Sequence, residues 1–540
     1  MTTWVIDMEA NGLEPDKIHC VVAQNVVTNE FFKSTDYEEI TDFLENRVKL
    51  CIGHYFSIYD IFWLEKLLNK RFDFKIYDTV STSWYLYPER ETHNLDDYGE
   101  ELGIKKPEIE DWDNLSPEEY LHRCTEDVKI NRAVWEKHKK LLRKIYKDEK
   151  DLRNFLDYLA FKMDCVREQQ RSKWKCDVDY IQGSLIDMMR EKERRKTTLE
   201  SVMPPVKKYG IKAKPKVFLK ADGSISSFGQ KWLDLLKEHD LPEDYDGEVK
   251  YVLKEEAPNA DSSHQRKEWL FSLGWIPTIF NYKKEDDGSI RSIPQIRDSK
   301  TGDMCEHIEE LMEEHPELEE LRGYSVLSHR IPMLQRMLKD QRGGYLTASV
   351  QGLTNTLRFI HAELCGADMS SLEDRLKHHF LYRHDPDYVI AMSTEGYDPH
   401  LALGMMAGML SQKEVDFYKY YDNKENMKLA DQEVVKEYKR IKSIRGIAKN
   451  GNYACQYGAG ASRIALTAGI SDTQAKQVHK GYWDLNWSIR TVAKEQYVKT
   501  VEGQKWLFNP ISCFWYSLRE EKDRFSTLIQ GSASFVFDMW

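Results

Sequence analysis

The 540-residue chain lacks the marks of membrane, exported and zinc-binding proteins. It has no apolar run of about 18 residues and no signal peptide, so we expect neither a membrane partner nor export. Its nine cysteines form no C-x-x-C pair, which argues against structural zinc and fits a reducing cytoplasm. Internal repeats and low-complexity tracts are also missing. The hydrophobic content of 41% is typical of globular proteins, and the length leaves room for two or more domains.

The chain also lacks an excess of positive charge. Its net charge of −12 is not typical of a DNA-binding protein. Acids gathered in metal sites contribute to this total, however, and phosphate contacts need only local basic patches. The best such patch is 190–220, which contains ERRK and VKKYGIKAKPKVFLK. A solvated charged helix and loop explains this patch equally well.

Four acids near the N-terminus follow a definite order. Asp7 and Glu9 in WVIDMEANGL are separated by one residue, and on a strand such residues point to the same side. Asp60 lies in CIGHYFSIYDIFWL, and Asp127 lies in LSPEEYLHRCTEDVKINRAVW. Each acid alone is explained as a surface residue, but the four in this order are a joint signal of one functional site.

The segment around Asp127 predicts a helix. Ser116 is a candidate cap, Pro117 occupies the first helical position, and Glu119 completes a capping box. His122 lies five residues before Asp127. The acid and the imidazole are therefore expected on one helix.

The pattern D-x-E, D, D with this histidine resembles the DEDD 3′–5′ exonucleases. The resemblance implies that the four acids bind metal and that His122 is the general base, which deprotonates the attacking water. Many phage relatives carry a tyrosine one position later, where this chain has Arg123. Asp78 in DTVSTSWYL is expected to be a structural buried carboxylate.

A second group of chemical residues lies in RGIAKNGNYACQYGAG. Residues spaced i, i+4 form one line along a helix, and two cations followed by two phenols suit phosphates, a sugar and a base. A solvated amphipathic helix explains the spacing about as well. Gly446 and Gly451 count against it, because glycine costs a helix interior roughly 1 kcal/mol and indicates close approach by another group. The line consists of Arg445, Lys449, Tyr453 and Tyr457.

A third segment, ELCGADMSSLEDRL, combines an apolar run with acids. The run 364–367 predicts a buried strand that ends at Asp368. A helix-like stretch follows, with Ser370 as a candidate cap and Glu373 in its first turns. Taken alone, the segment favours Asp368 as a helix N-cap. Beside the cationic line, it favours Asp368 as a metal ligand.

The spacings R-x3-K-x3-Y-x3-YG and D-x-S-x-x-E-x-R resemble the family A DNA polymerases, the pol I family. The resemblance implies that Asp368 binds two Mg²⁺ ions, for which Mn²⁺ can substitute, and that Glu373 blocks a ribose 2′-OH. It implies that His400 in YDPHLAL joins Arg445 and Lys449 on the triphosphate, with Tyr453 facing the sugar. The implied DNA contacts are Arg358 and Gln530.

The resemblance spans nearly the whole chain and implies a replicative bacteriophage polymerase. We expect an α/β exonuclease domain with a ribonuclease H-like fold at 1–145. An α+β polymerase domain of right-hand architecture should follow at 146–540. Its expected parts are the thumb at about 165–340, palm motif A at about 345–380, the fingers at about 385–490 and a return to the palm at about 491–540.

Two departures from the family leave the polymerase incomplete at the C-terminus. Motif C, which supplies a second catalytic carboxylate, is expected a few dozen residues beyond Trp540, and only nine residues separate Arg358 from Asp368. A split gene, a truncated enzyme and residues missing from the given sequence are all open explanations. The alternative functions are a stand-alone exonuclease with a DNA-binding platform and a non-catalytic replisome scaffold.

The expected partners are primer-template DNA and dNTPs. A processivity factor is possible near 204–256, where some phage enzymes carry such a loop, and a second polymerase fragment would supply motif C. The expected location is the cytoplasm of an infected bacterial host.

Overall fold

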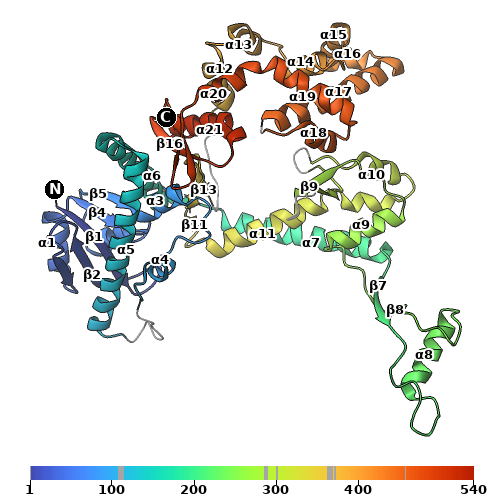
Figure 1. The fold of residues 1–540 in the computed structure, drawn as a ribbon, viewed down its shortest axis with the longest axis horizontal. Helices are drawn as coiled ribbons and strands as arrows, with labels where there is room; N and C mark the ends of the chain where they lie inside the picture. The colour runs from blue at the N-terminus through green and yellow to red at the C-terminus, as the bar shows by residue number, and fades with distance from the viewer. Residues whose placement is uncertain are drawn as a thin grey trace. The chain divides into compact units, whose positions relative to one another are not determined.

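The computed structural model describes residues 2–106, 115–284, 290–298, 302–348, 350–361, 369, 372–456 and 458–540. The chain divides into two compact units, Met1–Lys175 with Tyr345–Trp540 and Cys176–Gly344 (Figure 1). The first unit contains the ranges expected as exonuclease, palm and fingers, and the second overlaps the range expected as thumb. Within the described residues, no helix combines the length and apolar character that crossing a bilayer demands.

A five-stranded mixed sheet organises the N-terminal part of the first unit (Figure 1). The strand order is β3-β2-β1-β4-β5, with β1–β2 and β2–β3 antiparallel and β1–β4 and β4–β5 parallel. The helices between and after the strands give this part an α/β character. The strands are β1 (Thr3–Ala10), β2 (Ile18–Asn25), β3 (Phe31–Ser34), β4 (Leu50–Gly53) and β5 (Lys75–Asp78), and the helices are α1 (Tyr37–Asn46), α2 (Asp60–Leu67), α3 (Thr79–Leu86) and α4 (Leu95–Leu102).

The two faces of β1 pack into different cores, as the alternation of side chains along a strand requires. Trp4, Ile6 and Met8 belong to one cluster, whereas Val5 belongs to another that includes Val128 of α5 (Pro117–Ile145). Residues of odd number in β1 therefore face α5. This arrangement directs the first two acids of the pattern toward the helix that carries the last one.

The long helix α5 begins as predicted. The Ser116 hydroxyl accepts a hydrogen bond from the Glu119 backbone N–H at 3.2 Å, and the Glu119 carboxylate accepts one from the Ser116 N–H at 2.7 Å. Pro117 occupies the first turn, where its missing N–H costs nothing. After a break at 146–148, α6 (Glu149–Ser172) continues the chain.

A three-stranded antiparallel sheet joins this core from the far end of the sequence. Trp506 and Tyr516 are buried in the same cluster as α5 and α6, and the Tyr85 hydroxyl donates to the Trp515 carbonyl at 2.8 Å. The predicted exonuclease range and the return strands thus share one hydrophobic core. The sheet consists of β14 (Val498–Val501), β15 (Gln504–Asn509) and β16 (Phe514–Leu518).

The rest of the first unit is mostly helical. A second cluster packs α12, α17, α19 and α21 together through residues such as Leu381, Ala448 and Leu528. Short strands β6 (Trp174–Lys175) and β11 (Tyr345–Leu346) pair, as do β12 (Val350–Leu353) and β13 (Phe359–His361). The helices are α12 (Leu372–Leu381), α13 (Pro386–Ser393), α14 (Pro399–Met406), α15 (Gln412–Tyr421), α16 (Lys424–Lys428), α17 (Gln432–Gln456), α18 (Ala461–Ala468), α19 (Asp472–Leu485), α20 (Trp487–Glu495) and α21 (Arg524–Met539).

The second unit has its own core around the buried side chains of Trp269, Trp275 and Tyr324. Within it, β7 (Val206–Lys212) pairs with β8 (Val249–Glu256), and α8 (Ser227–Glu238) forms a separate small cluster around Trp232. The remaining elements are α7 (Val178–Val202), α9 (Ser263–Ser272), β9 (Phe280–Lys284), β10 (Ile290–Pro294), α10 (Glu306–Leu311), η1 (Pro316–Leu321) and α11 (Tyr324–Asp340).

Candidate functional site

Three of the four predicted acids meet between β1 and α5. Asp7, Glu9 and Asp127 each offer a carboxylate oxygen, and these oxygens lie within 4.8 Å of one another. Asp7 and Glu9 are half-buried on the α5 side of β1, and Asp127 is buried on the facing side of α5. Carboxylate oxygens at this spacing are the ligands that Mg²⁺ prefers.

Burial, and for Asp7 and Glu9 also the like charges of the cluster, disfavours ionisation of these acids. Burial, reinforced by Asp127, Asp60 and Glu9, raises the pKa of Asp7 well above its ordinary range. Burial and then Asp127 raise the pKa of Glu9 to about 7. Burial also raises the pKa of Asp127. A divalent cation would relieve this repulsion, so the donor set fits a metal ion.

Asp60 lies beside the cluster, outside the group of three. It is the first residue of α2 and is buried, and burial followed by the charge of Asp78 raises its pKa well above the usual value. Asp78 is buried as predicted and caps α3, and its carboxylate accepts from the backbone N–H groups of Tyr55 and Ser57, both at 3.0 Å. Asp78 therefore has the structural role expected of it.

The sequence reasoning missed two cations at the cluster. Lys106 Nζ lies 3.0 Å from Asp127 Oδ1 and 2.9 Å from Asp96 Oδ1. Arg123 Nε lies 3.3 Å from Asp127 Oδ2. The i, i+4 spacing of Arg123 and Asp127 on a helix could have predicted this ion pair. Lys106 lies in a separate loop, so no local spacing predicts its contact with Asp127.

His122 is placed on the outer side of α5. Its side chain is 65% exposed, and its Nδ1 lies 4.0 Å from Glu126 Oε1. The described contacts of His122 therefore involve Glu126, whereas Arg123 contacts the acid cluster. The role of His122 as general base stays a prediction.

The predicted cationic line lies on α17, as its spacing required. Arg445, Lys449 and Tyr453 are described, and Tyr457 lies outside the described residues. Lys449 and Tyr453 are exposed, whereas Arg445 is half-buried. The helix therefore exposes Lys449 and Tyr453 to solvent and partly covers Arg445.

His400 lies beside this line, on α14. Its ring centroid is 5.9 Å from that of Tyr453, and its Nδ1 is 3.3 Å from Asn452 Nδ2. Burial lowers the pKa of His400, and the charges of Arg445 and Lys449 lower it further against the opposing effect of Asp398. The structure thus brings together the three described residues of the line and the predicted histidine.

Arg445 has a partner that the sequence reasoning missed. Its Nε lies 2.7 Å from Asp398 Oδ2. The other oxygen of Asp398 caps α14, accepting from the N–H groups of His400 at 2.8 Å and Leu401 at 3.0 Å. The Asp-Pro pair before α14 was the available signal, because aspartate before a first-turn proline is typical of an N-cap.

The two glycines of α17 have different causes. A Cβ at Gly451 would come within 2.4 Å of Val478 Cγ1 on α19, so close helix packing requires glycine there. A Cβ at Gly446 would meet nothing within 4 Å. The close approach predicted at Gly451 therefore comes from a neighbouring helix.

The motif A segment is described only in part. Asp368, Ser370 and the expected strand 364–367 lie outside the described residues. Glu373 lies in the first turn of α12, and its Oε1 is 3.2 Å from an Arg358 guanidinium nitrogen. The predicted DNA contact Gln530 is half-buried on α21.

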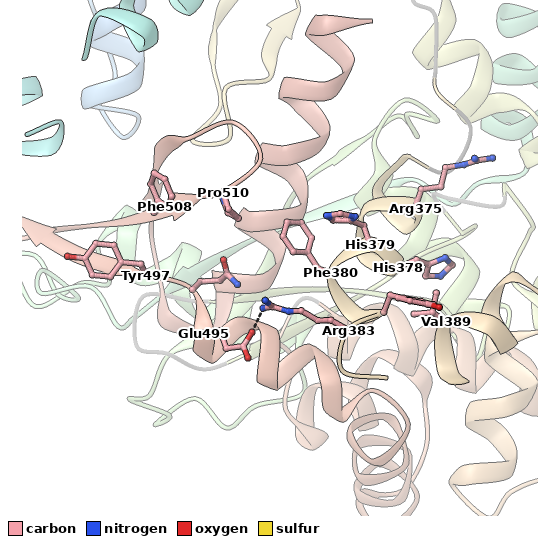
Figure 2. Close-up of a pocket in the computed structure, with 12 residues that line it drawn as sticks. Arg375, His378, His379, Phe380, Arg383, Val389, Glu495, Tyr497, Phe508 and Pro510 are labelled. Carbon is pink, nitrogen blue, oxygen red and sulfur yellow. Dashed lines mark hydrogen bonds and ion pairs between the residues drawn. The ribbon is translucent and has the colours of Figure 1, made fainter. Parts of the chain in front are cut away.

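A cavity of about 890 Å³ lies beside α12 (Figure 2). Arg375 and His379 line it from α12, and Phe508 and Pro510 line it from β15 and the residue that follows. Figure 2 shows the ion pair between Arg383 and Glu495 at its border. Arg445, Lys449 and Tyr453, the described residues of the cationic line, are not among the residues that line this cavity.

Comparison with known proteins identifies a fold. No family model matches the chain, and no curated protein matches its sequence. Among solved structures, the chain is similar to the POL domain of Pol1 from M. smegmatis, in complex with DNA primer-template and dNTP. The TM-score is 0.55 at 14% identity, and the match covers 99% of this chain and 84% of that one. The chain therefore has the fold of that polymerase domain.

Proposed function

We propose that the chain is a bacteriophage DNA polymerase of family A that also removes nucleotides from 3′ ends. The observation that carries this proposal is the fold, which is shared over 99% of the chain with a polymerase domain in complex with DNA primer-template and dNTP. The two groups of residues predicted from sequence add support. The acids Asp7, Glu9 and Asp127 converge as metal ligands would, and His400 lies beside Tyr453 of the cationic line.

The acid cluster suits a 3′–5′ exonuclease in a ribonuclease H-like domain. Asp7, Glu9 and Asp127 would hold divalent cations, with Asp60 beside them. Mg²⁺, or Mn²⁺ in its place, would supply polarisation of the phosphodiester. Asp7 and Glu9 come from strand β1 and Asp127 comes from helix α5, so regular secondary structure positions these three carboxylates.

His122 is proposed as the proton acceptor for the attacking water. It lies on the same helix as Asp127, five residues earlier, and its ring is solvent-accessible. An exposed imidazole can take a proton and release it to solvent without a relay.

The face of α17 suits a nucleoside triphosphate. Lys449, Arg445 and His400 would contact the phosphates, because the two cations of α17 and the adjacent imidazole on α14 offer several hydrogen-bond donors. Tyr453 would pack on the sugar, and Tyr457 is proposed to meet the base.

The palm is proposed to act through Asp368, with Glu373 excluding ribonucleotides. A catalytic pair of Mg²⁺ ions needs a second carboxylate opposite Asp368, which motif C supplies in the polymerases that the motifs resemble. We therefore expect nucleotide binding by this chain, and efficient extension only where a motif C carboxylate is present. Arg358 and Gln530 are the proposed DNA contacts.

The segment around 204–256 is proposed to bind a processivity factor. Its ribbon β7–β8 exposes Tyr209, Ile211 and Leu253, apolar side chains that a partner could cover. The proposed setting is the cytoplasm of an infected bacterium, where primer-template DNA and dNTPs are available.

Formation of a ternary complex tests the polymerase assignment independently of extension. A primer-template ending in a dideoxynucleotide is titrated with the protein in the presence of Mg²⁺ and the templated dNTP. The templated dNTP should tighten DNA binding about tenfold more than a mismatched one. Lys449→Ala should remove this preference, because the triphosphate loses a cation.

Lys442→Ala is the matched control, since Lys442 is an exposed lysine of the same helix outside the predicted line. Equal binding with matched and mismatched dNTPs, or equal loss in both lysine variants, would refute the nucleotide site on α17.

A further inference from the structure

Two cations share the Asp127 carboxylate. Lys106 Nζ is 3.0 Å from Oδ1, and Arg123 Nε is 3.3 Å from Oδ2. Asp127 is also one of the three acids whose oxygens converge within 4.8 Å. One carboxylate thus faces both a predicted metal position and a pair of fixed positive charges.

Both cations have a second anchor. Asp96, in the first turn of α4, lies 2.9 Å from Lys106 Nζ and 3.8 Å from an Arg123 guanidinium nitrogen. The side chains of Lys106 and Arg123 are 15% and 12% exposed, whereas that of Asp96 is 65% exposed. Asp96 therefore remains a solvated partner when Asp127 turns to another ligand.

A divalent cation and two protein cations compete for Asp127. Like charges on one carboxylate repel, so metal binding weakens the hold of Asp127 on Lys106 and Arg123. Lysine carries three donors on a flexible stem, and arginine carries five in a planar fork that matches phosphate geometry. Released donors at the edge of a nuclease site have an obvious acceptor, the phosphate of the bound DNA.

We propose that Lys106 and Arg123 hold Asp127 in the metal-free protein and turn to the phosphate of the 3′-terminal nucleotide when divalent cations bind. Asp96 keeps both cations within reach during this exchange. The inference rests on the proposed exonuclease and adds its phosphate-positioning residues. A purely structural brace, in which the two cations only tie the loop after α4 to α5, makes opposite predictions.

The first test measures Mn²⁺ binding to the metal-free protein without DNA. Only the sites lost in Asp7→Ala are scored, so that ions bound elsewhere do not count. Lys106→Met, which keeps the aliphatic stem, should tighten Mn²⁺ about threefold because a competitor is gone. Lys105→Met, at the exposed neighbouring residue, should change nothing. A brace predicts unchanged or weaker Mn²⁺ binding in Lys106→Met, and that result overturns the proposal.

Asp96→Asn gives the reverse test. Without the Asp96 charge, Lys106 and Arg123 pair more strongly with Asp127, so Mn²⁺ binding should weaken. If Asp96→Asn and Lys106→Met shift the Mn²⁺ affinity in the same direction, the competition for Asp127 is wrong.

The second test measures single-stranded DNA binding in Ca²⁺. One oligonucleotide has a normal 3′-terminal phosphodiester, and the other has an uncharged methylphosphonate at that linkage. Lys106→Met should bind the normal DNA about tenfold more weakly and should match the wild type on the methylphosphonate. An equal loss on both oligonucleotides would show that Lys106 does not read the terminal phosphate.

These outcomes are separable from failure of the exonuclease assignment. If the wild type degrades no 3′ ends in Mn²⁺, the proposed nuclease is wrong, whatever the variants do. If it degrades them and Asp7→Ala does not, but Lys106→Met behaves like Lys105→Met in both tests, only the phosphate-positioning role fails.

Discussion

The acid cluster between β1 and α5 and the cationic face of α17 both collect charge, but they balance it differently when no ligand is bound. On α17, Asp398 lies 2.7 Å from Arg445 and neutralises it, and the rest of the face is exposed to water. In the acid cluster, Lys106 and Arg123 lie beside Asp127, and the pKa values of Asp7 and Glu9 stay raised. The two protein cations thus compensate the cluster incompletely.

This difference indicates how far the charge balance of each region depends on its ligand. In a ligand-free anion site, a carboxylate of the protein can pair with the cations in place of the ligand, at little cost in stability. A site for divalent cations must hold several carboxylates close together, so it stores repulsion until protons or metal ions relieve it. We therefore expect that removal of metal lowers the stability of the acid cluster strongly, whereas removal of nucleotide lowers the stability of α17 only weakly.

The largest expected effect comes from removing two acids of the cluster. Asp7→Ala combined with Glu9→Ala should lower 3′–5′ degradation of single-stranded DNA by roughly a thousandfold or more, because the metal ligands on β1 are lost. Primer-template binding should be unchanged, since the proposed DNA contacts Arg358 and Gln530 are untouched. Glu38→Ala, at an exposed acid of α1, is the control. Full nuclease activity in the pure double variant would place the nuclease site elsewhere.

The next effect concerns stability and pH. Glu9 has a pKa of about 7 in the folded protein, above its ordinary 4.5, so the folded state binds this proton more tightly than the unfolded chain does. The resulting stability is fully present below pH 4.5 and is lost as the pH rises through 7. The loss amounts to at most about 3 kcal/mol for the metal-free protein.

Denaturant unfolding between pH 4 and 8 in a chelator, with wild type and Glu9→Gln, measures this loss. The wild type should lose stability relative to the variant as the pH rises, and Mg²⁺ at pH 8 should restore more stability to the wild type. Parallel pH curves for the two proteins would show that burial and Asp127 do not raise the pKa of Glu9, and the contrast between the two regions would disappear.

Sequence patterns located both regions because each depends on local periodicity. Asp7 and Glu9 share a face because they are two residues apart on a strand, and Arg445 and Lys449 share one because they are four apart on a helix. The capping box at Ser116 is equally local. Such local relations do not depend on how the rest of the chain packs.

What the sequence did not reveal are the counter-ions and the packing. Lys106 reaches Asp127 from a separate loop, and Asp398 reaches Arg445 across 47 positions of sequence. Val478 requires the glycine at 451 from another helix. These contacts depend on how the elements pack against one another, which no period in the sequence encodes.

A smaller effect is expected from releasing Arg445. Asp398→Asn keeps an oxygen to cap α14 and removes the charge that pairs with Arg445. The dNTP affinity in the ternary complex should stay the same or improve by up to about threefold, whereas Arg445→Ala should weaken it by about tenfold or more. Weaker dNTP binding in Asp398→Asn would mean that Asp398 orients Arg445 for the phosphate, and that α17 also depends on its ligand to balance its charge.

The smallest expected effect on ordinary synthesis comes from Tyr453→Phe. Tyr453 is 46% exposed and 5.9 Å from the His400 ring, so removing its hydroxyl should leave the fold of α17 intact. In the polymerases that the motif resembles, this hydroxyl substitutes for contacts that a missing 3′-OH cannot make. The variant should therefore reject dideoxynucleotides about tenfold more strongly, the worth of one hydrogen bond, with ordinary dNTPs nearly unaffected. Competition between dNTP and ddNTP in the ternary complex measures the ratio. An unchanged ratio would show that Tyr453 does not contact the sugar. The cations would then be the remaining proposed nucleotide contacts of α17.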